Sequence, residues 1–365
     1  MKQRHFVVLT LALFSVFILS ACTAQQADVV EATAEYAATQ NEEAQEQIQE
    51  EIQAQQPTQR VITDQMGREV VLPDGPLTIG LSRRTMLFTA INAGALDSIV
   101  SLSGFASGSI LEYAAPYLRY AAVITGTGTN INLEELANVN PDVFLVSIPD
   151  AHAVLESLEL LGIPAVVLNP EDFENIAVAM DIIGYLANNQ AQATAVVELF
   201  NQNLQLAATA VTSATHTPTA LMLGTSPLLV HPAGMIQHDV ITAAGAINVA
   251  GHLDGLSTIE MNIEEILEWN PEYIFITAFG ALEPSDILED SRFAQVTAVL
   301  NNNVFKFPSE LDWWDTPSAA VSLGVLWATH KMHPDLITFD QLNIAVGSLY
   351  YLIFGTEFGQ EFFGY

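Results

Sequence analysis

Apolar and polar positions divide the chain into a short apolar leader, an acidic polar segment and a long body of alternating elements. In the body, which begins near Arg60, short runs that are apolar throughout alternate with longer segments of helical character. Strands that are apolar on both faces are typical of parallel sheets with helices packed on each side. The pattern therefore predicts an α/β fold.

An internal repeat divides the body into two similar halves. Residues 132–147 align without gaps with residues 262–277, and each segment holds an Asn, two glutamates, an Asn-Pro pair and an apolar run in the same order. The first Asn is expected to cap a short helix, and the second glutamate stands where it completes a capping box. The Asn before Pro is biased away from the helical region, which ends the helix. Each half is thus predicted to contain the same helix–strand unit.

A helical segment from Glu174 to about Ser213 connects the halves, with an expected break near Asn188 and Asn189. The predicted fold class is α/β, with two Rossmann-like lobes that have parallel sheets and are joined by a single long helix. A body of this length exceeds what one core usually holds, which supports two lobes. The predicted organisation is a leader (1–22), an acidic flexible tether (23–59), an N-terminal α/β lobe (60–173), a linking helical segment (174–214) and a C-terminal α/β lobe (215–365).

The leader has the pattern of a secretory signal peptide. A basic start precedes an apolar run from Phe6 to Leu19, which is shorter than the roughly 20 residues of a transmembrane helix. The run leads into Leu-Ser-Ala-Cys, which resembles a bacterial lipobox, and Cys22 is the only cysteine of the chain. A lone cysteine cannot form an internal disulfide, so lipidation of Cys22 is predicted, with an ordinary signal peptide as the alternative. The tether that follows is read as a solvated segment, with a coiled coil as the alternative.

The charge of the chain excludes several partners. It has 42 acidic and 10 basic residues and a formal net charge of −32. Nucleic-acid binding needs basic contacts to phosphate, so this charge argues against nucleic acid and against an anionic membrane surface. No Gly-x-Ser-x-Gly, Walker or His-Glu-x-x-His motif occurs and the histidines are scattered, so neither catalytic residues nor a metal site are predicted.

The order of motifs along the body resembles a known family. The motifs are the opening Ile62–Arg68 segment, the two helix–Asn-Pro–strand units, Leu161–Val166, Pro317-Ser318 and His333-Pro334. From about Arg60 to Tyr365 the chain resembles the ABC-transporter substrate-binding proteins of the iron-siderophore, haem and cobalamin type. The resemblance implies a monomeric, extracytoplasmic, lipid-anchored binding protein without catalysis or cofactor. It would capture a small molecule between its lobes and deliver it to an ABC permease dimer, whose ATPase subunits hydrolyse ATP.

The resemblance also implies a docking role for the first glutamate of each repeat unit. Glu134 and Glu264 occupy pseudo-equivalent positions, and similar proteins use one such glutamate per lobe to meet arginines of the two permease subunits. The alternative is that both acids only complement the dipole at the start of a helix.

Candidate ligand-binding residues follow the predicted strands, because ligands of open α/β sheets bind outside the carboxyl ends of the strands. They are Arg83, Arg84, Ser103, Tyr113, Ser147, His231, Phe279, Trp313, Trp314 and Asp315. Two adjacent arginines at the start of a helix suit an anion, although one of them could instead pair with a nearby acid. Of the adjacent tryptophans one is expected to face the ligand, and the alternative places one in the core and one over a lobe edge.

The ligand itself is expected to be a ferric chelate, such as a siderophore or haem, because aromatic side chains suit planar or macrocyclic molecules. Cobalamin is the second expectation, and an oxyanion such as molybdate or tungstate is the third, since the arginine pair would suit it. A sensor or a hydrolase lipoprotein is the alternative from a different class.

Overall fold

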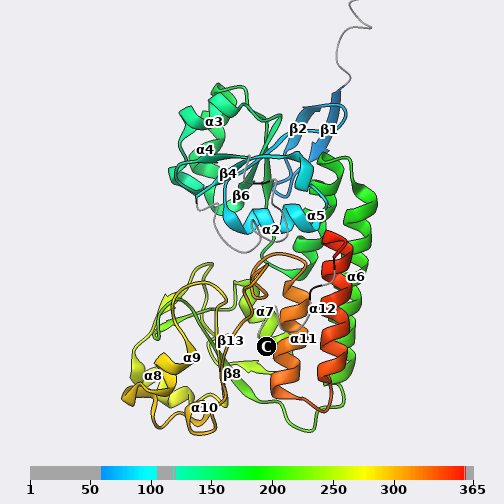
Figure 1. Cartoon of the computed structure of the whole chain (residues 1–365). Coiled ribbons are helices and arrows are strands. Elements are labelled where there is room, and N and C mark those ends of the chain that lie inside the picture. The colour runs from blue at the N-terminus through cyan, green and yellow to red at the C-terminus, as the bar shows by residue number, and fades with distance from the viewer. Residues whose placement is uncertain (1–58, 105–117, 119–120, 357, 359–365) are drawn as a thin grey trace, which may run out of the picture. The chain divides into compact units, whose positions relative to one another are not determined.

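The computed structural model describes residues 59–104, 118, 121–356 and 358, all within a unit that spans Thr58–Tyr365 (Figure 1). The first elements are two antiparallel strands, β1 (Gln59–Thr63) and β2 (Glu69–Pro73). This is the opening hairpin that the family resemblance implies.

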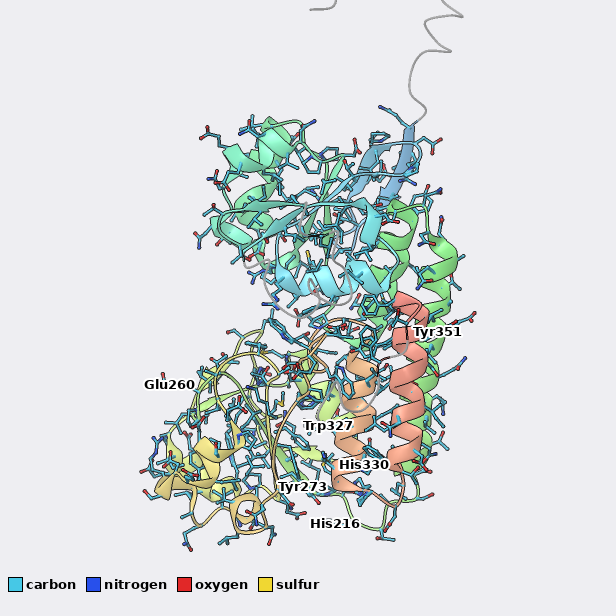
Figure 2. All side chains as sticks on the ribbon, in the orientation of Figure 1. His216, Glu260, Tyr273, Trp327, His330 and Tyr351 are labelled. Carbon is cyan, nitrogen blue, oxygen red and sulfur yellow. The ribbon has the colours of Figure 1, made fainter. Side chains whose placement is uncertain are left out.

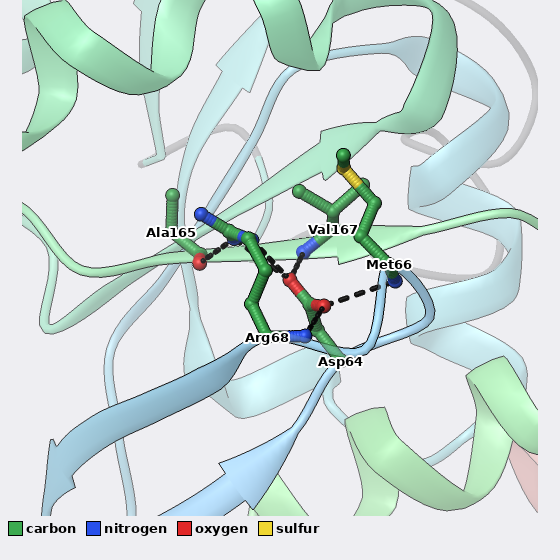
Figure 3. Close-up of polar contacts among 5 residues, drawn as sticks. All are labelled: Asp64, Met66, Arg68, Ala165 and Val167. Atoms are coloured by element: carbon green, nitrogen blue, oxygen red, sulfur yellow. Dashed lines mark hydrogen bonds and ion pairs between the residues drawn. The ribbon is translucent and has the colours of Figure 1, made fainter.

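The turn of this hairpin is organised by the buried carboxylate of Asp64 (Figure 3). One carboxylate oxygen accepts hydrogen bonds from the backbone N–H groups of Met66 and Arg68, both at 3.0 Å. The other accepts from the Arg68 guanidinium, at 2.7 Å to Nη2, and from the Val167 N–H at 3.1 Å. Arg68 also donates to the Ala165 carbonyl at 2.8 Å. Because Ala165 and Val167 belong to β7 (Ala165–Leu168), the edge strand of the first sheet, the ion pair attaches the hairpin to that sheet.

The first sheet is entirely parallel, as the run of apolar strands predicts. Its strand order is β5-β4-β3-β6-β7. The strands are β3 (Ile79–Leu81), β4 (Ile99–Ser103), β5 (Ala122–Ile124), β6 (Val143–Ser147) and β7 (Ala165–Leu168). The helices of this lobe are α2 (Arg84–Asn92), η1 (Leu96–Ser98), η4 (Gly128–Asn130), α3 (Leu133–Val139) and α4 (Ile148–Leu160).

Two helices connect the lobes, α5 (Phe173–Leu186) and α6 (Gln190–Val211). They separate at the expected place, where Asn188 has a φ of 56° and Asn189 precedes α6. The longer α6 runs beside α11 and α12 of the second lobe (Figure 1).

The second sheet is mixed. Its order is β11-β9-β8-β12-β13, and β10 also pairs with β8. The strands are β8 (Thr219–Leu223), β9 (Leu229–Val230), β10 (Ile247–Asn248), β11 (Ile259–Glu260), β12 (Tyr273–Ile276) and β13 (Val304–Lys306). Strands β8, β10, β12 and β13 are parallel as predicted, whereas the short β9 and β11 pair antiparallel.

Helices surround this second sheet. They are α7 (Ile236–Ala243), α8 (Ile263–Trp269), α9 (Pro284–Leu288), η5 (Ser291–Phe293), α10 (Thr297–Leu300), α11 (Val321–Met332) and α12 (Phe339–Phe354). The α/β class with two lobes is therefore confirmed.

The two helix–strand units of the repeat have closely similar geometry. Both α3 and α8 follow an Asn N-cap and end at a left-handed Asn, which is Asn140 (φ 50°) or Asn270 (φ 43°). Asn262 forms the complete capping box. In the first unit the predicted box is not closed, because the Glu135 carboxylate instead accepts hydrogen bonds from the N–H and hydroxyl of Thr125, at 2.6 and 3.0 Å.

Both sheets are buried on two faces. In β6, Leu145 contributes to one core while Phe144 and Val146 contribute to another. In β12, Phe275 and Ile274 divide in the same way. The core that contains Leu145 and Phe275 also contains residues of α5, α6, α11 and α12, so it is continuous from one lobe to the other.

Candidate functional site

Three of the predicted site residues meet between the lobes. The guanidinium carbon of Arg84, the first residue of α2, lies 4.8 Å from the ring centroid of Trp313, in the loop after β13. The ring of Phe279, which follows β12, lies 5.2 Å from that of Trp313. Phe88 of α2 packs edge-on against Trp313 at 5.4 Å. We refer to these four residues as the Arg84 cluster.

Arg84 has no ionic or hydrogen-bonding partner in the part of the chain that the structure describes. Apart from Lys2, Arg4 and Arg119, all basic residues lie in this part. All of them except Arg84 and Lys331 contact a carboxylate or backbone carbonyls. Burial lowers the pKa of Arg84, whose side chain is half-buried. A partly desolvated cation with unused donors is stabilised by an anion, and the planar guanidinium suits an oxyanion or a carboxylate.

Arg83, in contrast, is already paired. Its Nε and Nη2 donate to the two carboxylate oxygens of Asp150, each at 2.5 Å, and the Asp150 side chain is 1% exposed. This hydrogen bonding raises the pKa of Arg83. Gly128 lies against the pair, since a Cβ there would stand 2.8 Å from Arg83 Nη2. Of the two arginines predicted for the ligand, Arg83 is therefore the one that forms an intramolecular ion pair.

Trp314 and Asp315, which were predicted as ligand contacts, are fully buried in this structure. The Trp314 Nε1 donates to the Tyr350 hydroxyl at 2.8 Å within the core. The Asp315 carboxylate accepts hydrogen bonds from Thr277 Oγ1 at 2.5 Å and from the Ala278 N–H at 3.2 Å. In this structure both side chains hold the loop that positions Trp313. The adjacent tryptophans thus divide into one core residue and one half-buried residue beside Arg84.

His231 is also buried, at 0% exposure, and its ring nitrogens have no hydrogen-bond partner among the described residues. Burial lowers its pKa to about 4, so the imidazole is neutral at physiological pH. His231, which was predicted as a ligand residue, is thus a buried neutral side chain in this structure.

The remaining predicted ligand residues lie at strand ends or outside the described residues. Ser103 ends β4 and is 4% exposed, and its hydroxyl has no partner among the described residues. Ser147 ends β6 and precedes α4, with a half-buried side chain. Tyr113, predicted for the ligand, and Cys22, predicted for lipidation, lie outside the described residues.

The sequence interpretation missed the polar residues that join the lobes. Thr89 of α2 donates to the Pro317 carbonyl at 2.7 Å, and the Asn92 side chain accepts from the Ala319 N–H at 2.8 Å. Asp312, which is 2% exposed, accepts from Ser318 within the same segment of the second lobe. The Pro317-Ser318 motif was the available signal, but its partners are distant in sequence.

The two candidate docking glutamates are exposed and equivalent in position. Glu134 and Glu264 each stand second in their helices, α3 and α8, after an Asn N-cap. Neither forms a side-chain hydrogen bond or ion pair within the described residues. Both carboxylates are therefore free to meet a partner.

Within the described residues, no group of three or more His, Cys, Asp or Glu side chains is arranged to hold a metal ion. In the same residues, no helix combines the length and the apolar character needed to span a membrane.

The chain belongs to the periplasmic binding protein family, which it matches over residues 82–311. It is thus an extracytoplasmic solute-binding protein of the class that serves ABC transporters, as the family resemblance implies, and its relatives are binding proteins rather than enzymes.

Among curated proteins, it is similar to the molybdate-binding protein MolA of Haemophilus influenzae, with 24% identity over 327 residues, 82% of this chain and 92% of MolA. Molybdate-bound MolA has a TM-score of 0.72 at 22% identity, covering 82% of this chain and 99% of that one. A periplasmic solute binding protein from Veillonella parvula has a TM-score of 0.71 at 24% identity, and the match covers 83% of this chain and 95% of that one. Helicobacter pylori CeuE in its nickel–histidine complex has a TM-score of 0.71 at 20% identity, and the match covers 82% of this chain and 97% of that one. These structures establish the likeness of fold.

Proposed function

We propose that the chain captures an anionic solute between its lobes for an ABC importer, and that Arg84 binds the negative charge of that solute. The observation that carries the proposal is the half-buried guanidinium of Arg84, which lies on Trp313 without a carboxylate partner among the described residues. In a chain of net charge −32, an arginine at the junction of two lobes that has no acidic partner among the described residues favours an anion as its partner.

Within this class we propose an oxyanion of the molybdate and tungstate type as the first candidate. The similarity to MolA supports it, because that relative binds molybdate. The ferric chelate expected first from the sequence becomes the second candidate. Trp313 and Phe279 are half-exposed aromatic residues and would suit a flat chelate, but Trp313 already contacts Arg84, Phe88 and Phe279.

The test is calorimetric titration of the purified protein with molybdate, tungstate, sulfate, a ferric siderophore and haemin. We expect molybdate or tungstate to bind. Arg84→Met should lower the affinity for the anion by about 10- to 100-fold, since hydrogen bonds to charged groups contribute about 1.5–3 kcal/mol. The matched control is Arg292→Met, which removes the same charge from an exposed pair with Asp290 and should leave affinity unchanged. Binding of a chelate alone would replace the oxyanion, and equal affinities of the two variants would remove Arg84 from the site.

The docking role of Glu134 and Glu264 is the second part of the proposal. Two exposed carboxylates in equivalent first turns suit a permease with two-fold related basic sites. Attachment through a lipid on Cys22 would hold the protein near that permease.

A further inference from the structure

A surface cavity of about 410 Å³ lies on the second lobe. It is lined by β13 and the loop that follows it, by the start of α9 and by Trp327 and Lys331 of α11. None of the four cluster residues lines it. Its volume is within the range of about 300–1,000 Å³ that small-molecule sites occupy.

Lys331 is the second basic residue whose side-chain contacts among the described residues are to aromatic rings. Its ammonium lies 5.4 Å from the ring centroid of Phe305 and 5.5 Å from that of Trp327. It has no carboxylate or carbonyl partner among the described residues, and burial lowers its pKa. The ring quadrupoles and the C-terminal end of α11 stabilise this ammonium, and an anion would add the ionic partner that it lacks among the described residues.

Trp327 supplies a second unused donor in the same cavity. Its side chain is 2% exposed, and its Nε1–H has no hydrogen-bond acceptor among the described residues. Figure 2 shows Trp327 and His330 on α11, in the lobe that carries Tyr273. Buried donors are rarely left without an acceptor, because the missing hydrogen bond costs about 1–3 kcal/mol. A ligand oxygen would supply the acceptor.

The other charged groups of the cavity leave Lys331 available. Lys306 donates to Glu283 at 2.5 Å and to the Gly280 carbonyl at 3.1 Å, so its charge is already compensated. Glu310 is exposed at the rim. Phe305 and Pro284 are half-buried apolar residues of the lining.

We propose that this cavity is a second binding site, which takes a small organic carboxylate with an apolar body. The carboxylate pairs with the Lys331 ammonium and accepts from the Trp327 Nε1–H. The apolar body packs against the half-buried ring of Phe305. The site is independent of the solute site proposed between the lobes.

The test uses benzoate as the probe and the indole N–H resonances of the ¹⁵N-labelled full-length protein as the readout. Trp327→Phe identifies the Trp327 resonance by its loss. Benzoate is expected to shift that resonance downfield in a saturable way, and the neutral isostere benzamide should bind at least about tenfold more weakly. A Trp327 resonance that stays unmoved at saturating benzoate would overturn the proposal.

Matched variants test whether benzoate binds at Lys331. Lys331→Met should lower the affinity for benzoate about tenfold or more, whereas Lys331→Arg, which keeps the charge, should retain binding. Lys306→Met removes an ammonium that is already paired and should leave the shift in place. Arg84→Met should also leave it in place. Loss of the shift in Arg84→Met, or its persistence at full affinity in Lys331→Met, would refute this site.

Discussion

Burial of Asp312 predicts that the folded protein becomes less stable as the pH rises toward neutrality. Asp312 lies in the segment that joins the second lobe to α2, and it is 2% exposed. Burial raises its pKa to about 7, against the opposing effects of hydrogen bonds from Ser318, the Trp313 backbone and Asn92. The nearby Asp315, whose own pKa burial raises to about 6, adds a smaller rise.

Proton linkage gives the sign and the size of this change in stability with pH. The folded protein holds a proton on Asp312 up to about pH 7, whereas the unfolded chain releases it near the ordinary value of 3.8. The resulting stabilisation is complete below about pH 4 and is lost as the pH rises through about 7. The difference in pKa corresponds to about 4 kcal/mol in the free energy of unfolding. His231 acts in the opposite direction, because its lowered pKa of about 4 removes about 3 kcal/mol as the pH falls from about 6.5 to about 4.

Comparison with Asp312→Asn isolates the contribution of this carboxyl, since His231 affects both proteins equally. Urea unfolding from about pH 4 to about pH 8 gives each free energy of unfolding. We expect the stability of the variant relative to the wild type to rise with pH, by about 4 kcal/mol over this range. Asp290→Asn is the control of opposite sign, because hydrogen bonding to Arg292 lowers the pKa of Asp290. A difference between Asp312→Asn and wild type that does not change with pH would refute the reasoning.

Three further substitutions test other parts of the structure. Arg83→Met should destabilise the protein by about 3–5 kcal/mol in urea unfolding, because it leaves the buried Asp150 carboxylate without its partner; a loss below about 1 kcal/mol would contradict this role of Arg83. Gly128→Ala should cost about 1–2 kcal/mol in the same assay, since φ is +58° and the added Cβ meets that pair; wild-type stability would show that the turn relaxes freely. Glu134→Gln combined with Glu264→Gln should leave solute affinity intact and lower uptake in cells, whereas normal uptake would exclude docking through these carboxylates.

The fold was predictable because its signals are local. Apolar runs, Asn caps and Asn-Pro stops act over a few residues, and they predict the elements and the repeat. The antiparallel β9 (Leu229–Val230) and β11 (Ile259–Glu260) escaped prediction, because two-residue strands are too short to show a periodicity. The capping box of the first repeat unit is not closed for a different reason. Thr125, which lies outside the unit, donates hydrogen bonds to the Glu135 carboxylate.

The candidate site was predictable only as a set of strand-end positions. The sequence indicated that an arginine and a tryptophan would lie near the ligand, but adjacent residues of the same type have the same local pattern. Arg83 differs from Arg84 because the guanidinium of Arg83 forms an ion pair with Asp150, which is 67 positions away in the sequence. Trp314 differs from Trp313 because Tyr350, 36 positions away, accepts its N–H in the core.

The sequence by itself determined the α/β class, the two lobes with their repeated helix–strand unit, and the resemblance to the solute-binding family. These follow from periodicity, capping and motif order, which belong to short segments of chain. The tertiary structure decided which charges are compensated and which side chains are buried. Those properties depend on packing between distant segments, and they leave Arg84 and Lys331 without ionic partners among the described residues.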